Sequence, residues 1–197
     1  MSRVAPVQLL TVLAMAAAVS AAGSAMAQDQ QTVTVTGDAE KVCTLGQPTQ
    51  ADGALVNFDT PSGSVFAVTR LADPDSLSTR AANMTLGMPA MCNGVHRVAI
   101  ASDNNGLWRQ GAGAQPAGFG SAVPYKANLV WADQQYRMNA DASTRGFVQE
   151  QVIIGRPATG DLLIEFAIDA GATNAGSGAP LVAGDYSDVL RVTVEPQ

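Results

Sequence analysis

Residues 189–194 read Val-Leu-Arg-Val-Thr-Val, the clearest strand pattern in the chain. Leu190, Val192 and Val194 would share one face, because side chains alternate across a strand. The printed sequence continues only to Gln197. We therefore expect one edge of this last strand to remain free, and a free apolar edge invites strand addition from another chain.

Short apolar stretches separated by turns rich in Gly, Pro and Asn precede this strand, and no amphipathic helix of useful length interrupts them. The pattern predicts an all-β sandwich. The stretch at 95–101 is expected to pair with the stretch at 82–92 as an antiparallel pair, with Cys92 near the turn. The expected strands are 42–45, 54–58, 64–71, 82–92, 95–101, 125–131, 147–154, 161–168 and 189–194.

A second alternating segment, residues 31–37, reads Gln-Thr-Val-Thr-Val-Thr-Gly and has no obvious partner nearby. Val33 and Val35 would face one way and the threonines the other, and β-branched residues at this period favour an extended chain. We expect this segment to lack a partner strand in its own chain.

The chain begins with Arg3, an apolar run and small residues ending Ala-Met-Ala at position 27, the pattern of a cleaved secretory leader. The alternative is a membrane anchor, but the run is short, and no later run could span a bilayer. The formal net charge is −6 with no basic cluster. This charge argues against nucleic acid or an anionic membrane surface as a partner.

Cys43 and Cys92 are the only two cysteines. In an exported protein they predict one disulfide, which would close a loop of about 50 residues and contribute about 4 kcal/mol. Metal binding is the alternative, but two cysteines and the single His96 make a poor ligand set.

No motif indicates an enzyme, a cofactor or a metal site. The lone His96 lies in a strand context and is read as a packed or surface residue rather than a general base. Asp185 and Asp188 lie in a turn, where carboxylates more often accept hydrogen bonds from turn amides than perform acid–base chemistry. The long segment 102–124 carries Trp108 and Phe119, which could line a sugar site but are read as local packing.

The sequence Ala-Gly-Asp-Tyr-Ser-Asp-Val-Leu-Arg-Val-Thr-Val at 183–194 closely resembles the terminal motif of spore coat protein U domain proteins, the pilins of archaic chaperone-usher pili. The motif residues are Gly184, Tyr186 and Asp188. The valine-rich segment before Cys43, the position of Cys92 and the strand at 125–131 also match the family.

This resemblance implies an incomplete immunoglobulin-like sandwich that lacks its last strand and is completed by donor-strand complementation. It implies a signal peptide (1–27), a donor segment (28–38) and a pilin domain (39–197). The groove would include Leu190, Val192 and Val194. The donor residues would be Thr32, Val33, Thr34, Val35, Thr36 and Gly37.

The implied function is that of a structural subunit of a surface pilus, which supports adhesion and biofilm formation. The implied partners are a periplasmic chaperone, an outer-membrane usher and neighbouring pilin subunits, and the protein would be exported through the periplasm to the cell surface. The alternative function is an adhesive or carbohydrate-binding β-sandwich. A secreted hydrolase is disfavoured because no base or nucleophile context is present.

Overall fold

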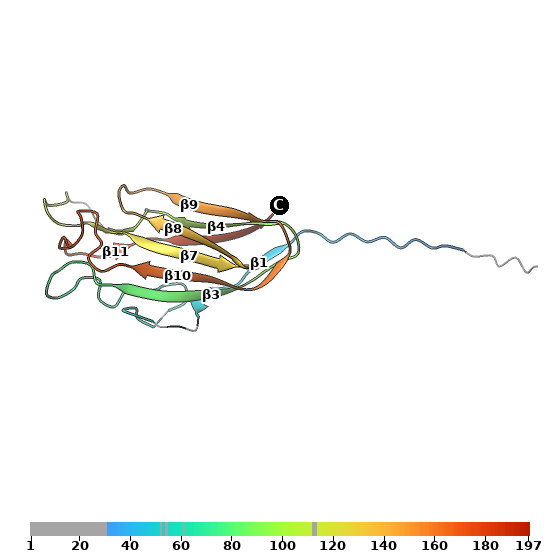
Figure 1. Ribbon diagram of the computed structural model, residues 1–197, viewed down its shortest axis with the longest axis horizontal. Helices are drawn as coiled ribbons and strands as arrows, with labels where there is room; N and C mark the ends of the chain where they lie inside the picture. The colour runs from blue at the N-terminus through green and yellow to red at the C-terminus, as the bar shows by residue number, and fades with distance from the viewer. Residues whose placement is uncertain (1–30, 52, 54, 61, 112–113) are drawn as a thin grey trace, which may run out of the picture. The chain divides into compact units, whose positions relative to one another are not determined.

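The computed structural model describes residues 31–51, 53, 55–60, 62–111 and 114–197. The chain divides into two units, of which the first ends at Asp38 and the second is Ala39–Gln197. The described residues form strands, turns and loops without a helix, which confirms the predicted all-β class (Figure 1). The predicted leader, residues 1–27, lies outside the described residues.

The second unit contains twelve strands among the described residues. They are β1 (Cys43–Leu45), β2 (Thr49–Gln50), β3 (Ala82–Cys92), β4 (His96–Ser102), β5 (Leu107–Arg109), β6 (Ala122–Val123), β7 (Tyr125–Trp131), β8 (Gln134–Ala140), β9 (Val148–Ile154), β10 (Ala158–Ile168), β11 (Tyr186–Ser187) and β12 (Leu190–Pro196).

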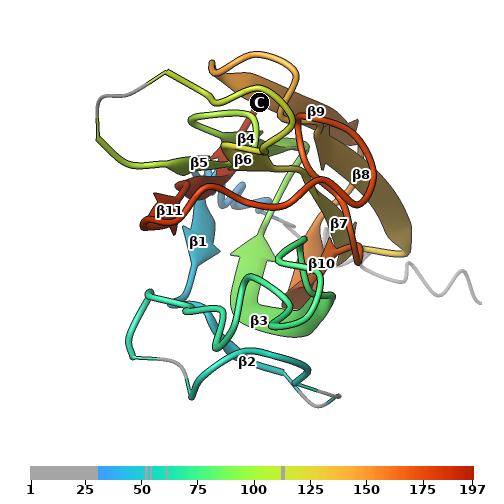
Figure 2. The same cartoon turned by 90° about the vertical axis from the view of Figure 1, so that its left-hand side faces the viewer.

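The largest sheet has the order β1-β3-β10-β7-β8, and β2 pairs with the same edge of β3 as a second short segment. A second sheet has the order β12-β4-β9, and a small third sheet the order β11-β5-β6. The strand pairs are antiparallel. Figure 2 shows β3, β10 and β7 on one side of the fold and β4 and β9 on the other. The arrangement is consistent with a β-sandwich.

Alternating burial explains why these residues form two facing layers. On β3, Met84, Leu86 and Met88 are buried, and on β4, Val98 and Ile100 are buried. These side chains belong to one continuous apolar cluster. Each layer therefore covers the apolar face of the other, which supplies the main driving force for folding.

The disulfide prediction is confirmed, because Cys43 and Cys92 are bonded at an S–S distance of 2.05 Å. The two cysteines are directly paired in the antiparallel ladder between β1 and β3. The bond therefore fixes the start of the first strand to the end of the third.

The expected pairing of residues 82–92 with 95–101 is wrong. Both segments are strands, but β3 pairs with β1, β2 and β10, whereas β4 pairs with β9 and β12. Because both strands direct a buried apolar face toward the shared core, the chain crosses between layers after Cys92 instead of forming a hairpin. The Asn93 side chain anchors this crossing through bonds of 2.7 Å to the Val42 amide and to the Glu40 carbonyl.

The expected strands at 54–58 and 64–71 are also wrong. The described residues of these stretches form only isolated bridges, among them Phe58 with Val68 and Val56 with Asn83. Strand β8, by contrast, was not predicted, because most of its residues are polar and exposed and only Met138 and Ala140 are buried. An edge strand of this kind carries little apolar periodicity.

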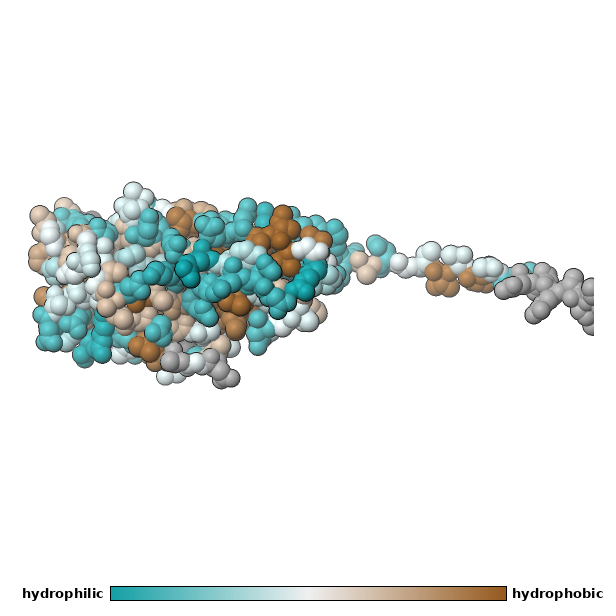
Figure 3. Space-filling model, in the orientation of Figure 1, coloured by the Kyte–Doolittle hydropathy of each residue, from teal (hydrophilic) through white to brown (hydrophobic). Residues whose placement is uncertain are grey.

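Residues 31–38, described by themselves, form no strand and are exposed throughout. Val33 and Val35 are 84% and 89% exposed, and Figure 3 shows hydrophobic side chains at the surface of this segment. Apolar side chains that are this exposed gain nothing from burial in their own chain.

Candidate functional site

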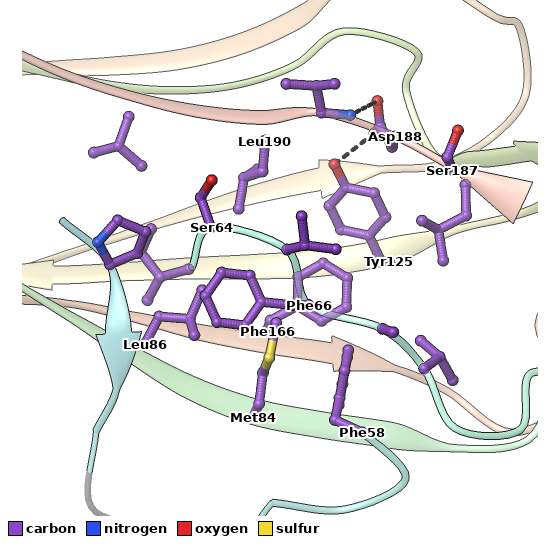
Figure 4. Close-up of a pocket in the computed structure, with 18 of the residues that line it drawn as sticks. Phe58, Ser64, Phe66, Met84, Leu86, Tyr125, Phe166, Ser187, Asp188 and Leu190 are labelled. Carbon is purple, nitrogen blue, oxygen red and sulfur yellow. Dashed lines mark hydrogen bonds between the residues drawn. The ribbon is translucent and has the colours of Figure 1, made fainter. Parts of the chain in front are cut away.

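A groove of about 1000 Å³ opens into the core of the second unit (Figure 4). One wall comes from β3 and the end of β1, and the other comes from the β11–β12 region. Segment 64–68, which belongs to no strand, also lines it. Most of the lining side chains are apolar, so the groove is suited to a ligand that carries apolar side chains.

Aromatic and methionine side chains form the floor. Phe166 on β10 meets Phe58 edge-on at a centroid distance of 5.8 Å and Tyr125 on β7 at 4.7 Å. Met84 and Leu86 on β3 extend the same surface. Figure 4 shows these five side chains gathered in one cavity.

Strand β12 forms one wall. Leu190 and Val192 line the groove, whereas Val194 is half-buried against the core and is not part of the lining. Strand β12 pairs with β4 along its whole length, and its other edge has no strand partner among the described residues. A strand paired on one side only leaves about half of its amide and carbonyl groups free to pair with an added strand.

The opposite wall depends on an interruption of the first strand. Strand β1 ends at Leu45, and Gly46, Gln47 and Pro48 lead into the groove lining before β2 resumes the pairing with β3. The Gly46 amide donates to the Pro89 carbonyl at 2.7 Å. A Cβ at this glycine would meet the Pro89 ring at 3.0 Å, so a side chain there would push the two segments apart.

Asp188 holds the start of β12 in place. Its carboxylate accepts hydrogen bonds from the hydroxyls of Tyr125, at 2.7 Å, and Ser102. It also accepts from the Asn104 and Val189 amides at 3.0 and 2.7 Å. The carboxylate therefore accepts hydrogen bonds from backbone amides of the turn, as its turn context predicts, and orders the start of β12.

The other two motif residues also have structural roles. The Tyr186 hydroxyl donates to the Val182 carbonyl at 2.7 Å, which closes the turn before β12. Gly184 has φ +147°, and a Cβ there would meet the Arg109 side chain at 3.0 Å. The motif thus fixes the geometry of the groove wall, because all three residues lie in the lining segment 184–190.

Burial raises the pKa of the Tyr125 hydroxyl far above its ordinary value, and the neighbouring Asp188 carboxylate raises it further. Burial also raises the pKa of Tyr186. Both phenols therefore remain neutral hydrogen-bond donors well into the alkaline range, as a structural role requires.

Of the residues considered for other functions, Asp185 and Asp188 line the groove, whereas His96, Trp108 and Phe119 are not part of its lining. His96 is fully buried, with Nδ1 at 2.8 Å from the Gly94 carbonyl and its ring beside Trp131, so it is a packed residue. Trp108 is half-buried on β5, and its indole nitrogen is shielded from solvent. Phe119, 39% exposed, is the more accessible of the two aromatics considered for a sugar site.

The described residues contain no group of three or more His, Cys, Asp or Glu side chains placed to hold a metal ion. Within the same residues, no helix has the length and apolar character needed to cross a membrane.

Comparison with protein-family models, with curated proteins and with solved structures found no significant match to this chain. The assignment to the spore coat protein U family accordingly stays a prediction from residues 183–194 and the supporting positions.

The sequence predicted Leu190 and Val192 as groove residues and singled out Gly184, Tyr186 and Asp188 as motif residues, but it did not predict the floor of the groove. Phe58, Tyr125 and Phe166 come from three separate segments, and no spacing along the chain connects them. The only signal in the sequence was weak, a short apolar stretch around Phe58 that ends in a turn.

Proposed function

We propose that this protein is a structural subunit of an extracellular filament assembled by donor-strand exchange. In this proposal the second unit is an immunoglobulin-like sandwich that lacks one strand. Residues 28–38 of one copy insert into the groove of the next copy and pair with the free edge of β12. Because the contact is head-to-tail and does not close on itself, repeated insertion builds a fibre.

The observation that carries the proposal is the coincidence of an apolar groove with an unpaired strand edge. Leu190 and Val192 line the groove from the same strand whose outer edge lacks a partner among the described residues. A ligand that satisfies both features needs backbone groups for the edge and alternate apolar side chains for the groove, and an extended peptide strand supplies both.

Residues 31–37 have the composition of such a ligand. Val33 and Val35 alternate with threonines and are almost fully exposed, and the segment forms no strand in its own chain. The threonines would face solvent, and the two valines would enter the groove. The likeness of residues 183–194 to the terminal motif of archaic pilins supports the same assignment.

The expected route of assembly includes a periplasmic chaperone, which lends a strand to the groove until an outer-membrane usher replaces it with the donor of the next subunit. The fibre would be displayed at the cell surface and would support adhesion and biofilm formation. An open apolar groove in an exported subunit needs such protection, because exposed apolar surface and unpaired strand edges promote aggregation.

The test compares polymer formation by the exported protein with that of three variants. Val35→Asp, and deletion of residues 28–37, should reduce denaturant-resistant multimers on unheated gels while leaving a soluble subunit. Thr34→Asp, which changes the solvent face of the same segment, is the matched control and should still polymerise. Equal polymerisation by the deletion variant would contradict the proposal.

A further inference from the structure

We propose that segment 62–69 is an internal placeholder, a stretch of the subunit's own chain that occupies part of the groove until a donor strand displaces it. This inference rests on the proposed function and adds a step to it. We call residues 62–69 the placeholder segment.

The placeholder segment lies in the groove. Residues 64–68 belong to the groove lining together with Leu190 and Val192 of β12. Figure 4 shows Ser64 and Phe66 in the same cavity as Leu190 and Phe166. The segment forms part of the groove wall, so a strand inserted beside β12 would have to move it wherever the two overlap.

Side chains of the placeholder segment alternate as those of an inserted strand would. Phe66 and Val68 are half-buried and pack against the core, whereas Val65, between Ser64 and Phe66, is 66% exposed. The two inward residues are separated by one exposed residue, Ala67. Val33 and Val35 are also two positions apart. The segment therefore presents two apolar side chains at the same spacing as the predicted donor.

Few backbone bonds hold the placeholder segment, and none of them forms a strand pair with β12. The Asp59 amide donates to the Ala67 carbonyl at 2.8 Å, and the Thr69 amide donates to the Asn57 carbonyl at 3.0 Å. Its turn is closed by two further bonds, from the Val65 amide to the Ser62 carbonyl at 3.1 Å and from the Ser62 amide to the Val65 carbonyl at 3.2 Å. The Thr69 hydroxyl also donates to the Asp59 carboxylate at 2.8 Å. A segment with so few backbone bonds opens at low free-energy cost compared with a strand inside a sheet.

The physical consequence is a competition. Phe66 and Val68 shield the apolar floor from water in the free subunit. This shielding limits nonspecific association of free subunits through the groove. A donor strand gains both the floor and the hydrogen bonds of the β12 edge, which the placeholder segment leaves unused. The donor should therefore displace the segment, at a rate that depends on how firmly Phe66 and Val68 are packed.

The kinetic test uses the full exported chain with Val33→Asp and Val35→Asp, so that its own tail cannot donate. The probe is a synthetic peptide of residues 28–38, and its insertion is followed by fluorescence anisotropy. Adding Phe66→Ala or Val68→Ala should speed insertion about tenfold, because weaker packing of the segment lowers the barrier to its displacement. Ile153→Ala, an equally apolar change at a residue that is 64% exposed on β9, is the control and should leave the rate unchanged.

Hydrogen exchange provides a second measurement that needs no substitution in the groove. In the same tail-disabled chain, peptide binding should accelerate exchange at the Val65 and Thr69 amides and slow exchange along β12. A bound peptide with unchanged exchange at these two amides, or equal insertion rates in all variants, would overturn the placeholder while leaving the proposed function intact. Failure of the peptide to bind at all would overturn both.

Discussion

The Tyr125 hydroxyl on β7 donates a hydrogen bond of 2.7 Å to the Asp188 carboxylate, which lies just before β12. The bond connects a strand of the largest sheet to the short link between β11 and β12, and both residues line the groove (Figure 4). The same carboxylate accepts bonds from the Ser102 hydroxyl and the Asn104 amide. Asp188 thereby sets where β12 begins, and with it the position of the groove wall.

Asp188→Ala should destabilise the subunit by about 3 kcal/mol, because the buried hydroxyls of Tyr125 and Ser102 would lose their acceptor. Urea denaturation of the purified subunit measures the change. Asp185→Ala, at an exposed aspartate of the same turn, should stay within about 0.5 kcal/mol of the parent. Similar losses for the two variants would show that Asp188 has no special role.

Tyr125 should also make the subunit sensitive to alkali. Burial raises its folded-state pKa above the ordinary value of 10.0, so its stabilising contribution is complete below that value and is lost as the pH rises toward the folded-state pKa. Between about pH 8 and about pH 11, the denaturation midpoint of the parent should therefore fall more than that of Tyr125→Phe. Parallel falls in the two proteins would show that folding does not raise the pKa of Tyr125.

Loss of the disulfide should lower the free energy of unfolding more than loss of the hydrogen bonds to Asp188. Cys43 and Cys92 are 49 positions apart, and a cross-link over a loop of that size contributes about 4 kcal/mol in the chain-entropy description. The double variant Cys43→Ser, Cys92→Ser should show this loss in urea denaturation and should accumulate poorly after export. Reduction of the parent should reproduce the loss, and an unchanged denaturation midpoint would contradict it.

The sequence allowed the all-β class and the disulfide to be predicted because each depends on a local or countable signal. The alternation of Leu190, Val192 and Val194 is visible without a partner strand, and two cysteines allow one intramolecular pairing. Residues of β3 and β4 were likewise recognised as strands from their apolar period. Their pairing was not, because alternation gives the buried face of a strand but not the neighbour beside it.

The groove was predictable only on its β12 side. Phe58 and Phe66 come from stretches that resemble ordinary strands in sequence, yet the described residues there form isolated bridges and turns. Their burial depends on Phe166, about a hundred positions later, which no local pattern reveals. The role proposed for the placeholder segment depends on the cavity that it lines, and no sequence pattern predicts that cavity.

Substitutions at two neighbouring positions of β12 distinguish a role in donor binding from a role in folding. Val192 lines the groove and Thr193 is exposed. In Val192→Asp a carboxylate faces the apolar floor, where an unpaired charge is costly in contact with an inserted valine. We expect polymer formation to slow at least about tenfold, whereas Thr193→Asp should assemble as the parent does. The assay is the time course of denaturant-resistant multimers, and circular dichroism with a free-thiol assay checks that both variants keep the fold and the disulfide. If folded Val192→Asp polymerises as fast as Thr193→Asp, the donor does not contact this wall.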